Sequence, residues 1–162
     1  MQISKHFIYK EFVHTDHTQF LKENYEQGKQ YIDHMRIIAN FGLEPLRARY
    51  GMPIYCSSLF RCLDLHYYIY KKINEWRVSQ GLKEISVPLT SQHLEAWAVD
   101  FIVKNISCQK VFEYIQIKDC LKFGQLIWEK DRGKQWIHWG SPTLENNGQV
   151  LIFENGKYRK VK

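Results

Sequence analysis

The hydrophobic and polar positions of residues 29–50 follow approximately helical spacing rather than strict alternation. Apolar side chains recur there at Tyr31, Met35, Ile38, Leu43 and Leu46, which predicts a helix. Because Pro45 falls inside this stretch, we expect a kink or a break near Gly42. We expect a second helix at Leu63–Gln80. For residues 7–28 we expect only short helical turns and loops.

Segments with the composition and alternation of β-strands are gathered mostly in the second half. We expect one helix at residues 109–119 and a hairpin turn at Asn155-Gly156. The predicted strands cover residues 53–58, 97–103, 125–129, 136–140, 149–154 and 157–161. Helices come first and strands later, with connections too short for regular βαβ alternation. This order favours an α+β fold, in which helices pack against one side of a small antiparallel sheet.

Length and composition indicate one globular domain. A chain of 162 residues can bury a sizeable core but is short for two, so we expect a single domain over residues 1–162. The N-terminus lacks the apolar run of a signal peptide, and no stretch is long and uncharged enough to cross a bilayer. We therefore expect synthesis in the cytoplasm and no membrane partner. The four cysteines lack Cys-x-x-Cys spacing, so reduced, structural thiols are expected.

The net charge of +6 favours an anionic partner. The basic residues are scattered, however, and only the tail at residues 157–162 forms a run. A solvated basic end is the simpler interpretation of that run, and an anionic bacterial cell wall would suit the charge as well as a nucleic acid. Since net charge is all that supports nucleic-acid binding, we do not expect a nucleic-acid partner.

Candidate chemistry is concentrated around His93 and Asp100. Two zinc ligands on one helix typically lie four residues apart, whereas this separation of seven suits one ligand in a loop and one on a strand. Alternation along residues 97–103 places Asp100 on the face opposite the bulky side chains. His138 is the candidate for a third ligand. Two histidines and one carboxylate with an open fourth position is a recognised arrangement for a hydrolytic zinc ion.

Strand parity provides a candidate base beside this site. If residues 130–135 form the loop of a hairpin, Ile127 lies opposite His138. In the same register Glu129 lies opposite Trp136, on the same face as His138. Glu129 and His138 would then be diagonal neighbours, about 7 to 8 Å apart. A carboxylate at that distance can take a proton from metal-bound water and pass it to a leaving amine.

The same residues resemble the zinc D-Ala-D-Ala carboxypeptidases and the related peptidoglycan endopeptidases, including phage endolysins. The family motif S-x-H-x-x-G-x-A-x-D corresponds to Ser91, His93, Ala96, Ala98 and Asp100, and the later W-[IV]-H element corresponds to residues 136–138. Further similar segments are the S-G-Y-R element at residues 58–61, the strand before the last histidine at 125–129, and residues 43–47 and 10–12. The resemblance thus covers most of residues 7–140.

This resemblance implies a zinc metallopeptidase with a D-Ala-D-Ala carboxypeptidase-like fold, which hydrolyses peptide stems or cross-links of bacterial peptidoglycan. It implies that His93, Asp100 and His138 bind Zn²⁺. It also implies that Arg61 pairs with a substrate carboxylate or carbonyl, and that Ser91 positions the substrate or its own loop. We expect a monomer that is made in the cytoplasm and is then released to the cell wall on lysis or carried in a virion.

The chain departs from the family pattern at three positions. Ala96 and Leu59 stand where relatives have glycine, whose backbone freedom the family fold can need. Gln135 stands where many relatives have an acidic residue, and a neutral amide cannot act as a base. Glu129 is our candidate for that role. Two weaker substitutes are Asp131 and Glu95. The alternative is an inactive zinc-binding protein that acts as a cell-wall-binding or virion structural module.

Overall fold

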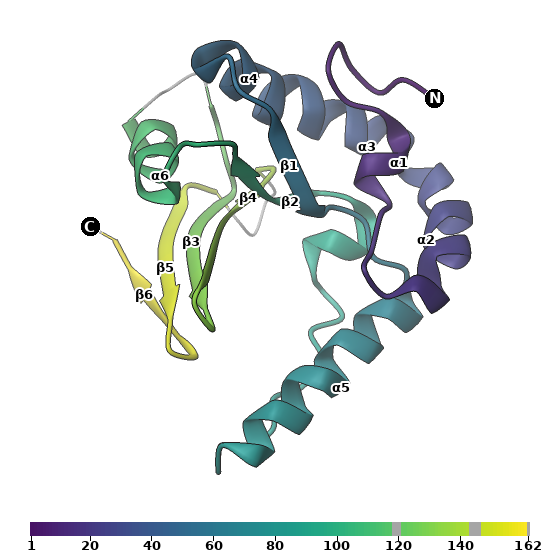
Figure 1. Cartoon of the computed structure of the whole chain (residues 1–162), viewed down its shortest axis with the longest axis vertical. Coiled ribbons are helices and arrows are strands. Elements are labelled where there is room, and N and C mark those ends of the chain that lie inside the picture. Colours follow the sequence, from purple (N-terminus) through teal and green to yellow (C-terminus); the bar gives the residue numbers. More distant parts are fainter. Residues whose placement is uncertain (118–120, 143–146, 162) are drawn as a thin grey trace.

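The computed structural model describes residues 1–117, 121–142 and 147–161 and has an α+β fold, as predicted (Figure 1). Its helices are α1 (Tyr9–Phe12), α2 (Leu21–Gly28), α3 (Ile32–Ile37), α4 (Glu44–Tyr50), α5 (Leu63–Ser79) and α6 (Cys108–Ile117). Its strands are β1 (Ile54–Ser58), β2 (Ala98–Val103), β3 (Gln125–Asp131), β4 (Lys134–Gly140), β5 (Gln149–Glu154) and β6 (Lys157–Lys160). Short 3-10 turns lie at Thr18–Phe20, Lys29–Tyr31 and Gln92–Glu95. All six predicted strands are present, each within two residues of its expected bounds.

The helix predicted at residues 29–50 changes to a π-helical turn near Gly42, where the sequence predicted a kink or a break. It consists of a 3-10 turn, α3, a π-helical turn at Ile38–Leu43 and α4. Pro45 lies in the first turn of α4, where a missing N–H group costs no helical hydrogen bond. Gly42 packs against the indole ring of Trp139, since a Cβ atom added there would lie 3.0 Å from the ring. The break therefore lies where the helical segment passes close to the sheet.

Further sequence predictions are confirmed within the described residues. The helices α5 and α6 occupy the two other segments expected to be helical. Cys56, Cys62 and Cys108 are free thiols, as expected. Three predictions extend beyond the described residues. These are the end of the predicted helix at 118–119, the fourth cysteine, Cys120, and the last residue of the basic tail, Lys162. No helix in the part of the chain that the structure describes is long and apolar enough to span a membrane.

The six strands form one mixed sheet in the order β1-β2-β4-β3-β5-β6. Neighbouring strands are antiparallel except β3 and β5, which are parallel. The prediction of an antiparallel sheet is therefore not confirmed. Because β2 occupies the free edge of β4, the next strand, β5, extends the sheet on the far side of β3. β5 reverses direction relative to β4, so it runs parallel to β3.

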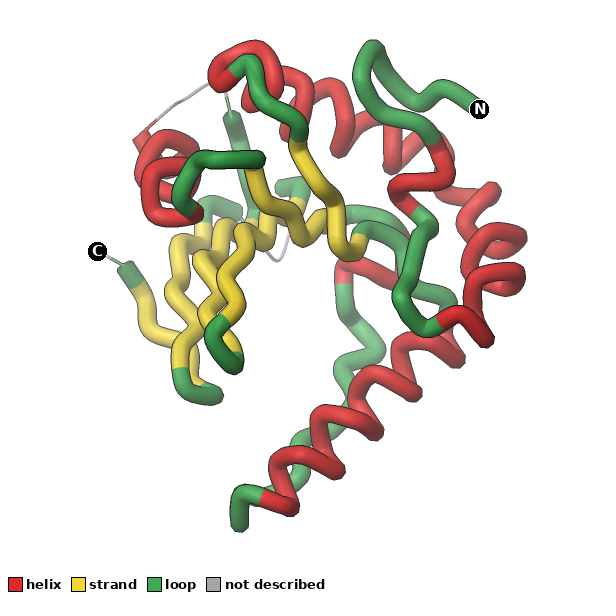
Figure 2. The backbone as a smooth tube through the Cα atoms, viewed as in Figure 1, coloured by secondary structure: helices red, strands yellow, loops and turns green. Residues whose placement is uncertain are grey.

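The two faces of the sheet differ in chemistry, as strand alternation predicts. One face is apolar and packs against α6 and the π-helical turn beside α4. Its buried residues include Val99, Phe101, Leu126, Ile137 and Trp139. The opposite face carries Asp100 and His138. In Figure 2 the strands form a curved layer with α6 and the α3–α4 segment on one side, whereas α5 lies on the other side. The sequence predicted helices on one side of the sheet, whereas in the structure they lie on both sides.

Candidate metal centre

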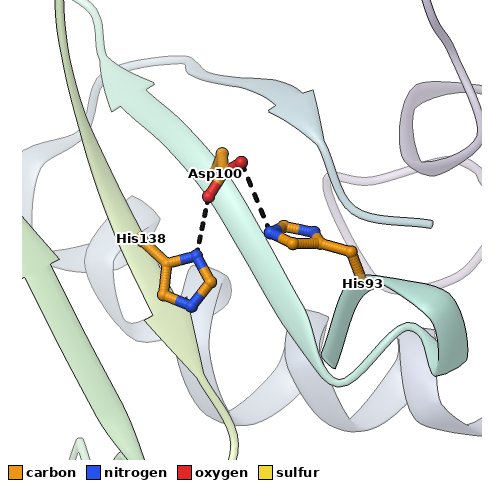
Figure 3. Close-up of side chains that lie close together, drawn as sticks. All are labelled: His93, Asp100 and His138. Carbon is orange, nitrogen blue, oxygen red and sulfur yellow. Dashed lines mark hydrogen bonds and ion pairs between the residues drawn. The ribbon is translucent and has the colours of Figure 1, made fainter. Parts of the chain in front are cut away.

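The three predicted metal ligands meet on the polar face of the sheet (Figure 3). His93 comes from the 3-10 turn Gln92–Glu95, which immediately precedes β2. Asp100 lies in the middle of β2, and the sheet register pairs it directly with His138 on β4. One nitrogen or oxygen atom from each of the three side chains lies within 4.8 Å of the others. The structure thus brings together the loop ligand and the two strand ligands that the sequence predicted.

Asp100 lies close to both imidazoles through its two oxygens. Its Oδ2 lies 3.4 Å from His93 Nε2, and its Oδ1 lies 2.8 Å from His138 Nδ1, a direct hydrogen bond. Bonds of about 2.0 to 2.1 Å to zinc place tetrahedral ligand atoms roughly 3.4 Å apart. The pair formed by His93 and Asp100 already has this spacing, whereas a metal ion held by both Asp100 and His138 would replace the hydrogen bond between them. The residues present therefore suit a small divalent metal ion.

The burial of the cluster leads to the same conclusion. His93, Asp100 and His138 are 5%, 7% and 7% exposed. Within the described residues, the Nε2 atom of His138 is buried and has no hydrogen-bond partner. A buried polar atom without a protein partner requires an explanation, and a bound ion or water molecule is a common one. Two buried imidazoles and a carboxylate form a donor set that can hold such an ion.

His93 is oriented by a hydrogen bond to the backbone. Its Nδ1–H donates to the carbonyl oxygen of Leu59 over 2.9 Å, so that Nε2 points toward Asp100 with its lone pair free. Burial, with the nearby Arg61 guanidinium adding to it, lowers the pKa of His93 to about 4. The ring is therefore neutral at physiological pH, which is the form that binds a metal.

Asp100 and His138 form an electrostatically linked pair. Burial alone would raise the pKa of Asp100, but His93 and His138 hold that pKa well below its usual range. Burial alone would lower the pKa of His138, but its hydrogen bond with Asp100 outweighs burial and raises that pKa. Asp100 is therefore ionised at neutral pH and supplies the negative charge of the site.

Glu129 lies on the same face, in the register that the sequence predicted. Ile127 pairs with His138, and Glu129 pairs with Trp136. The hairpin continues to Asp131 and Lys134, so its turn is shorter than the expected loop, but the pairing is unchanged. Burial and the negative charge of Asp100 raise the pKa of Glu129 to about 7. A carboxyl group with a pKa near neutrality can both accept and donate a proton at physiological pH.

Gln135, at the position where the motif of the resembled family has an acid, faces away from the site. It lies three residues before His138 on the same strand, so the two side chains point to opposite faces. Its Oε1 atom accepts a hydrogen bond of 3.0 Å from Trp128 Nε1 on the apolar face. Of the two weaker candidates for the base, Glu95 is exposed, and Asp131 pairs with Arg132 at the hairpin turn. Glu129 is better placed than either.

Arg61 contacts the candidate ligands directly. Its Nε atom donates to Ser58 Oγ over 2.7 Å, and its Nη2 atom donates to Asp100 Oδ2 over 2.9 Å. The backbone N–H of Arg61 also donates to the carbonyl oxygen of His93. These contacts fix the orientation of Asp100, while binding of a substrate by Arg61 remains a prediction.

Ser91 has a local backbone role. It precedes the 3-10 turn that carries His93, and its carbonyl oxygen accepts a hydrogen bond from the N–H of Leu94. Its own N–H donates to the carbonyl oxygen of Pro88. The residue therefore helps to hold the loop before His93, and its contact with a substrate remains a prediction.

Ala96 adopts a left-handed backbone conformation, which glycine adopts more easily than any other residue. It ends the 3-10 turn with φ of 57° and ψ of 34°, in the left-handed region, and its side chain is fully buried. This conformation costs an L-residue roughly 1–2 kcal/mol. Leu59 is not among the residues with positive φ, and its carbonyl oxygen orients His93. Ala96, unlike Leu59, thus has a strained backbone conformation.

Two tyrosines near the cluster were missed by the sequence analysis. Burial raises the pKa of Tyr70 on α5, with Arg61 opposing this and the charges of Glu129 and Asp100 adding to it. Desolvation of its hydroxyl end raises the pKa of Tyr158 on β6, although the side chain as a whole is 59% exposed, and Glu129 is the charge that adds most to this effect. The hairpin turn before β6 could have indicated the face of Tyr158. Nothing in the sequence indicated the position of Tyr70.

Comparisons of this chain with protein-family models, with curated proteins and with solved structures found no match.

Proposed function

We propose that this chain is a zinc-dependent peptidase that hydrolyses peptide stems or cross-links of bacterial peptidoglycan. The observation that carries the proposal is the buried cluster of His93, Asp100 and His138, with the carboxyl group of Glu129 on the same sheet face. Metal binding rests on this geometry. The substrate class rests on the resemblance of the ordered sequence motifs to D-Ala-D-Ala carboxypeptidases and related endopeptidases.

Each residue near the cluster has a role in this chemistry. A bound zinc ion would polarise the scissile carbonyl and acidify a water molecule. His93 is kept neutral and aimed by its hydrogen bond to Leu59. Arg61 holds Asp100 in place through an ion pair of 2.9 Å. Glu129, with its pKa near neutrality, takes up a proton during attack on the carbonyl and delivers it to the leaving amine.

The alternative function is an inactive zinc-binding protein that acts as a cell-wall-binding or virion structural module. It is favoured by Gln135, which replaces the acid of many relatives and is engaged with Trp128 on the apolar face. In this alternative the metal stabilises the fold, and Glu129 is a buried carboxyl group without a catalytic role. Both functions predict zinc, and only the first predicts hydrolysis.

Metal content and peptide release together test the proposal. We expect one zinc ion per purified chain, and peptide release from purified peptidoglycan by the wild type. His138→Ala should lose both the metal and the activity, whereas Glu129→Ala should keep the metal and lose activity by at least about a hundredfold. The matched control is Glu84→Gln, because Glu84 is exposed in the loop after α5. This control should behave like the wild type in both assays.

Each result distinguishes between the alternatives. Stoichiometric zinc in a wild type that releases no peptide would exclude the peptidase and leave the binding module. Absence of zinc from a folded wild type, even after incubation with the metal, would exclude both functions. Full activity of Glu129→Ala would leave a zinc peptidase whose base is another residue.

A further inference from the structure

Tyr158 lies on the sheet face that carries the metal centre. The sheet register pairs Tyr158 with Phe153 on β5, and Phe153 pairs with Glu129 on β3. Directly paired residues share a face, so Tyr158, Glu129 and Trp136 form one row across the sheet. Tyr158 is 59% exposed, and its ring contacts Phe153 with ring centroids 4.8 Å apart. Tyr158 thus lies in the row of Glu129 on this face, two strands away from it at the edge of the sheet.

Tyr70 approaches the same region from α5. Tyr70 and Arg77 are seven residues apart, so they lie on one side of the helix, with about 10 Å between them along its axis. Arg77 meets the β5–β6 turn, since a Cβ atom added to Gly156 would lie 3.8 Å from its Nη1 atom. The neighbouring Trp76 contacts Arg132 of the β3–β4 turn at 5.5 Å. The side of α5 that carries Tyr70 therefore faces the two hairpins.

The two hydroxyl groups are available to a ligand. Ring contacts hold Tyr70 against His66, at 4.9 Å, and Tyr158 against Phe153. Among the described residues, neither hydroxyl forms a hydrogen bond with a protein group. Both phenols have a raised pKa, so both are neutral donors at physiological pH. Glu129 and Asp100 are the carboxyl groups whose charges act on both phenols. A neutral acceptor such as a peptide carbonyl suits hydroxyl donors in this position.

We propose that Tyr70 and Tyr158 are substrate-binding residues, which donate hydrogen bonds to backbone carbonyl groups of the peptide from two sides of the metal centre. This inference rests on the proposed peptidase function and names how its substrate is held. Tyr70 lies near Arg61 and contacts the part of the peptide that Arg61 binds. Tyr158 lies nearer to Glu129 and contacts the part beside the leaving amine.

Removal of each hydroxyl tests the proposal while preserving the ring contacts. The variants are Tyr70→Phe, Tyr158→Phe and the double variant, assayed as zinc-loaded protein on a soluble stem pentapeptide. Loss of one hydrogen bond should raise KM about threefold to tenfold, and the double variant should show about the product of the two effects. We expect kcat to change less than about twofold, with zinc content and unfolding midpoint unchanged. A purely structural role would move the unfolding midpoint and leave KM at the wild-type value.

The matched control is Tyr68→Phe. Tyr68 is on the opposite side of α5, where its ring contacts His17 and Phe20. This variant should keep the wild-type KM. If Tyr70→Phe and Tyr158→Phe also keep it, the proposal is wrong, whereas the peptidase function stands.

A second measurement separates this inference from the proposed function. If the wild type does not cleave the pentapeptide, the peptidase function fails, and titration calorimetry with the uncleaved pentapeptide tests the hydroxyls instead. Weaker binding by Tyr70→Phe and Tyr158→Phe than by Tyr68→Phe would then support a peptide-binding module that uses these groups. Equal binding by all three variants, or no binding by the wild type, would overturn the inference.

Discussion

The carboxyl group of Glu129 should make the stability of the metal-free protein depend on pH. Folding raises its pKa from an ordinary value of 4.5 to about 7, first through burial and then through the charge of Asp100. The folded state therefore holds this proton at pH values where the unfolded chain has released it. Stability from this group is fully present below pH 4.5 and is lost as pH rises through 7.

Glu129→Gln isolates this effect, because the amide has the shape of the protonated acid and stays neutral. A pKa difference of about 2.5 units corresponds to roughly 3 kcal/mol at full ionisation. Relative to the wild type, the variant should gain about 1 kcal/mol at pH 5, about 2 kcal/mol at pH 6 and about 3 kcal/mol at pH 8. The sign is fixed: the variant gains relative stability as pH rises.

Urea unfolding in the presence of a chelator measures the difference. Unfolding free energies of wild type and Glu129→Gln are compared between pH 5 and pH 8, with Glu84→Gln as the exposed control. Glu84→Gln should follow the wild type over the whole range. A difference between Glu129→Gln and the wild type that stays constant with pH would refute the reasoning, because the carboxyl group would then titrate alike in both states. Zinc should reduce the gain, since a nearby cation lowers the pKa of a carboxyl group.

Three further outcomes are expected. Zinc at about a hundred times its dissociation constant should raise the unfolding free energy of the wild type by roughly 3 kcal/mol and leave His93→Ala unchanged in calorimetric scans. Ala96→Gly should change stability by less than about 1 kcal/mol, because relief of roughly 1–2 kcal/mol of strain is offset by a lost buried methyl group and a more flexible unfolded chain. Ala96→Val should lose at least about 2 kcal/mol in the same urea assay. Equal stability of the two variants would contradict the strained backbone. Asn24→Ala should lose at least about 2 kcal/mol of unfolding free energy in urea. Its fully buried side-chain amide donates to the carbonyl oxygens of Val13 and Phe60 and accepts from the N–H of Cys62. A loss below about 0.5 kcal/mol would exclude this role.

Local periodicity predicted the part of the fold that carries the candidate site. Side chains on a strand alternate with period two, so a stretch such as 97–103 reveals which of its residues share a face. The β3–β4 hairpin is longer than expected, yet Glu129 and His138 still share a face. Lengthening both strands by the same number of residues leaves their register unchanged. The predicted neighbourhood of these two side chains was therefore insensitive to the error in loop length.

The features that the sequence did not predict depend on contacts between distant segments. β5 runs parallel to β3 because β2, which comes much earlier in the chain, already occupies the other edge of β4. Likewise, Tyr70 belongs to a helix with an irregular mixture of aromatic and charged residues, which gives no indication of the side that faces the sheet. The contacts of Trp76 and Arg77 with the hairpin turns define that side in the structure.

The contrast between local alternation and contacts across strands also bears on Gln135, which stands where the motif of the resembled family has an acid. Comparison with the family motif along the sequence drew attention to Gln135, three positions before the last histidine. On a regular strand an odd separation places two side chains on opposite faces, so even an acid at position 135 of this strand would point into the apolar face beside Trp128. An acid on the face of His138 has to come from an even position of β4 or from a neighbouring strand. Glu129 on β3 meets this requirement, and for this reason we propose it as the base.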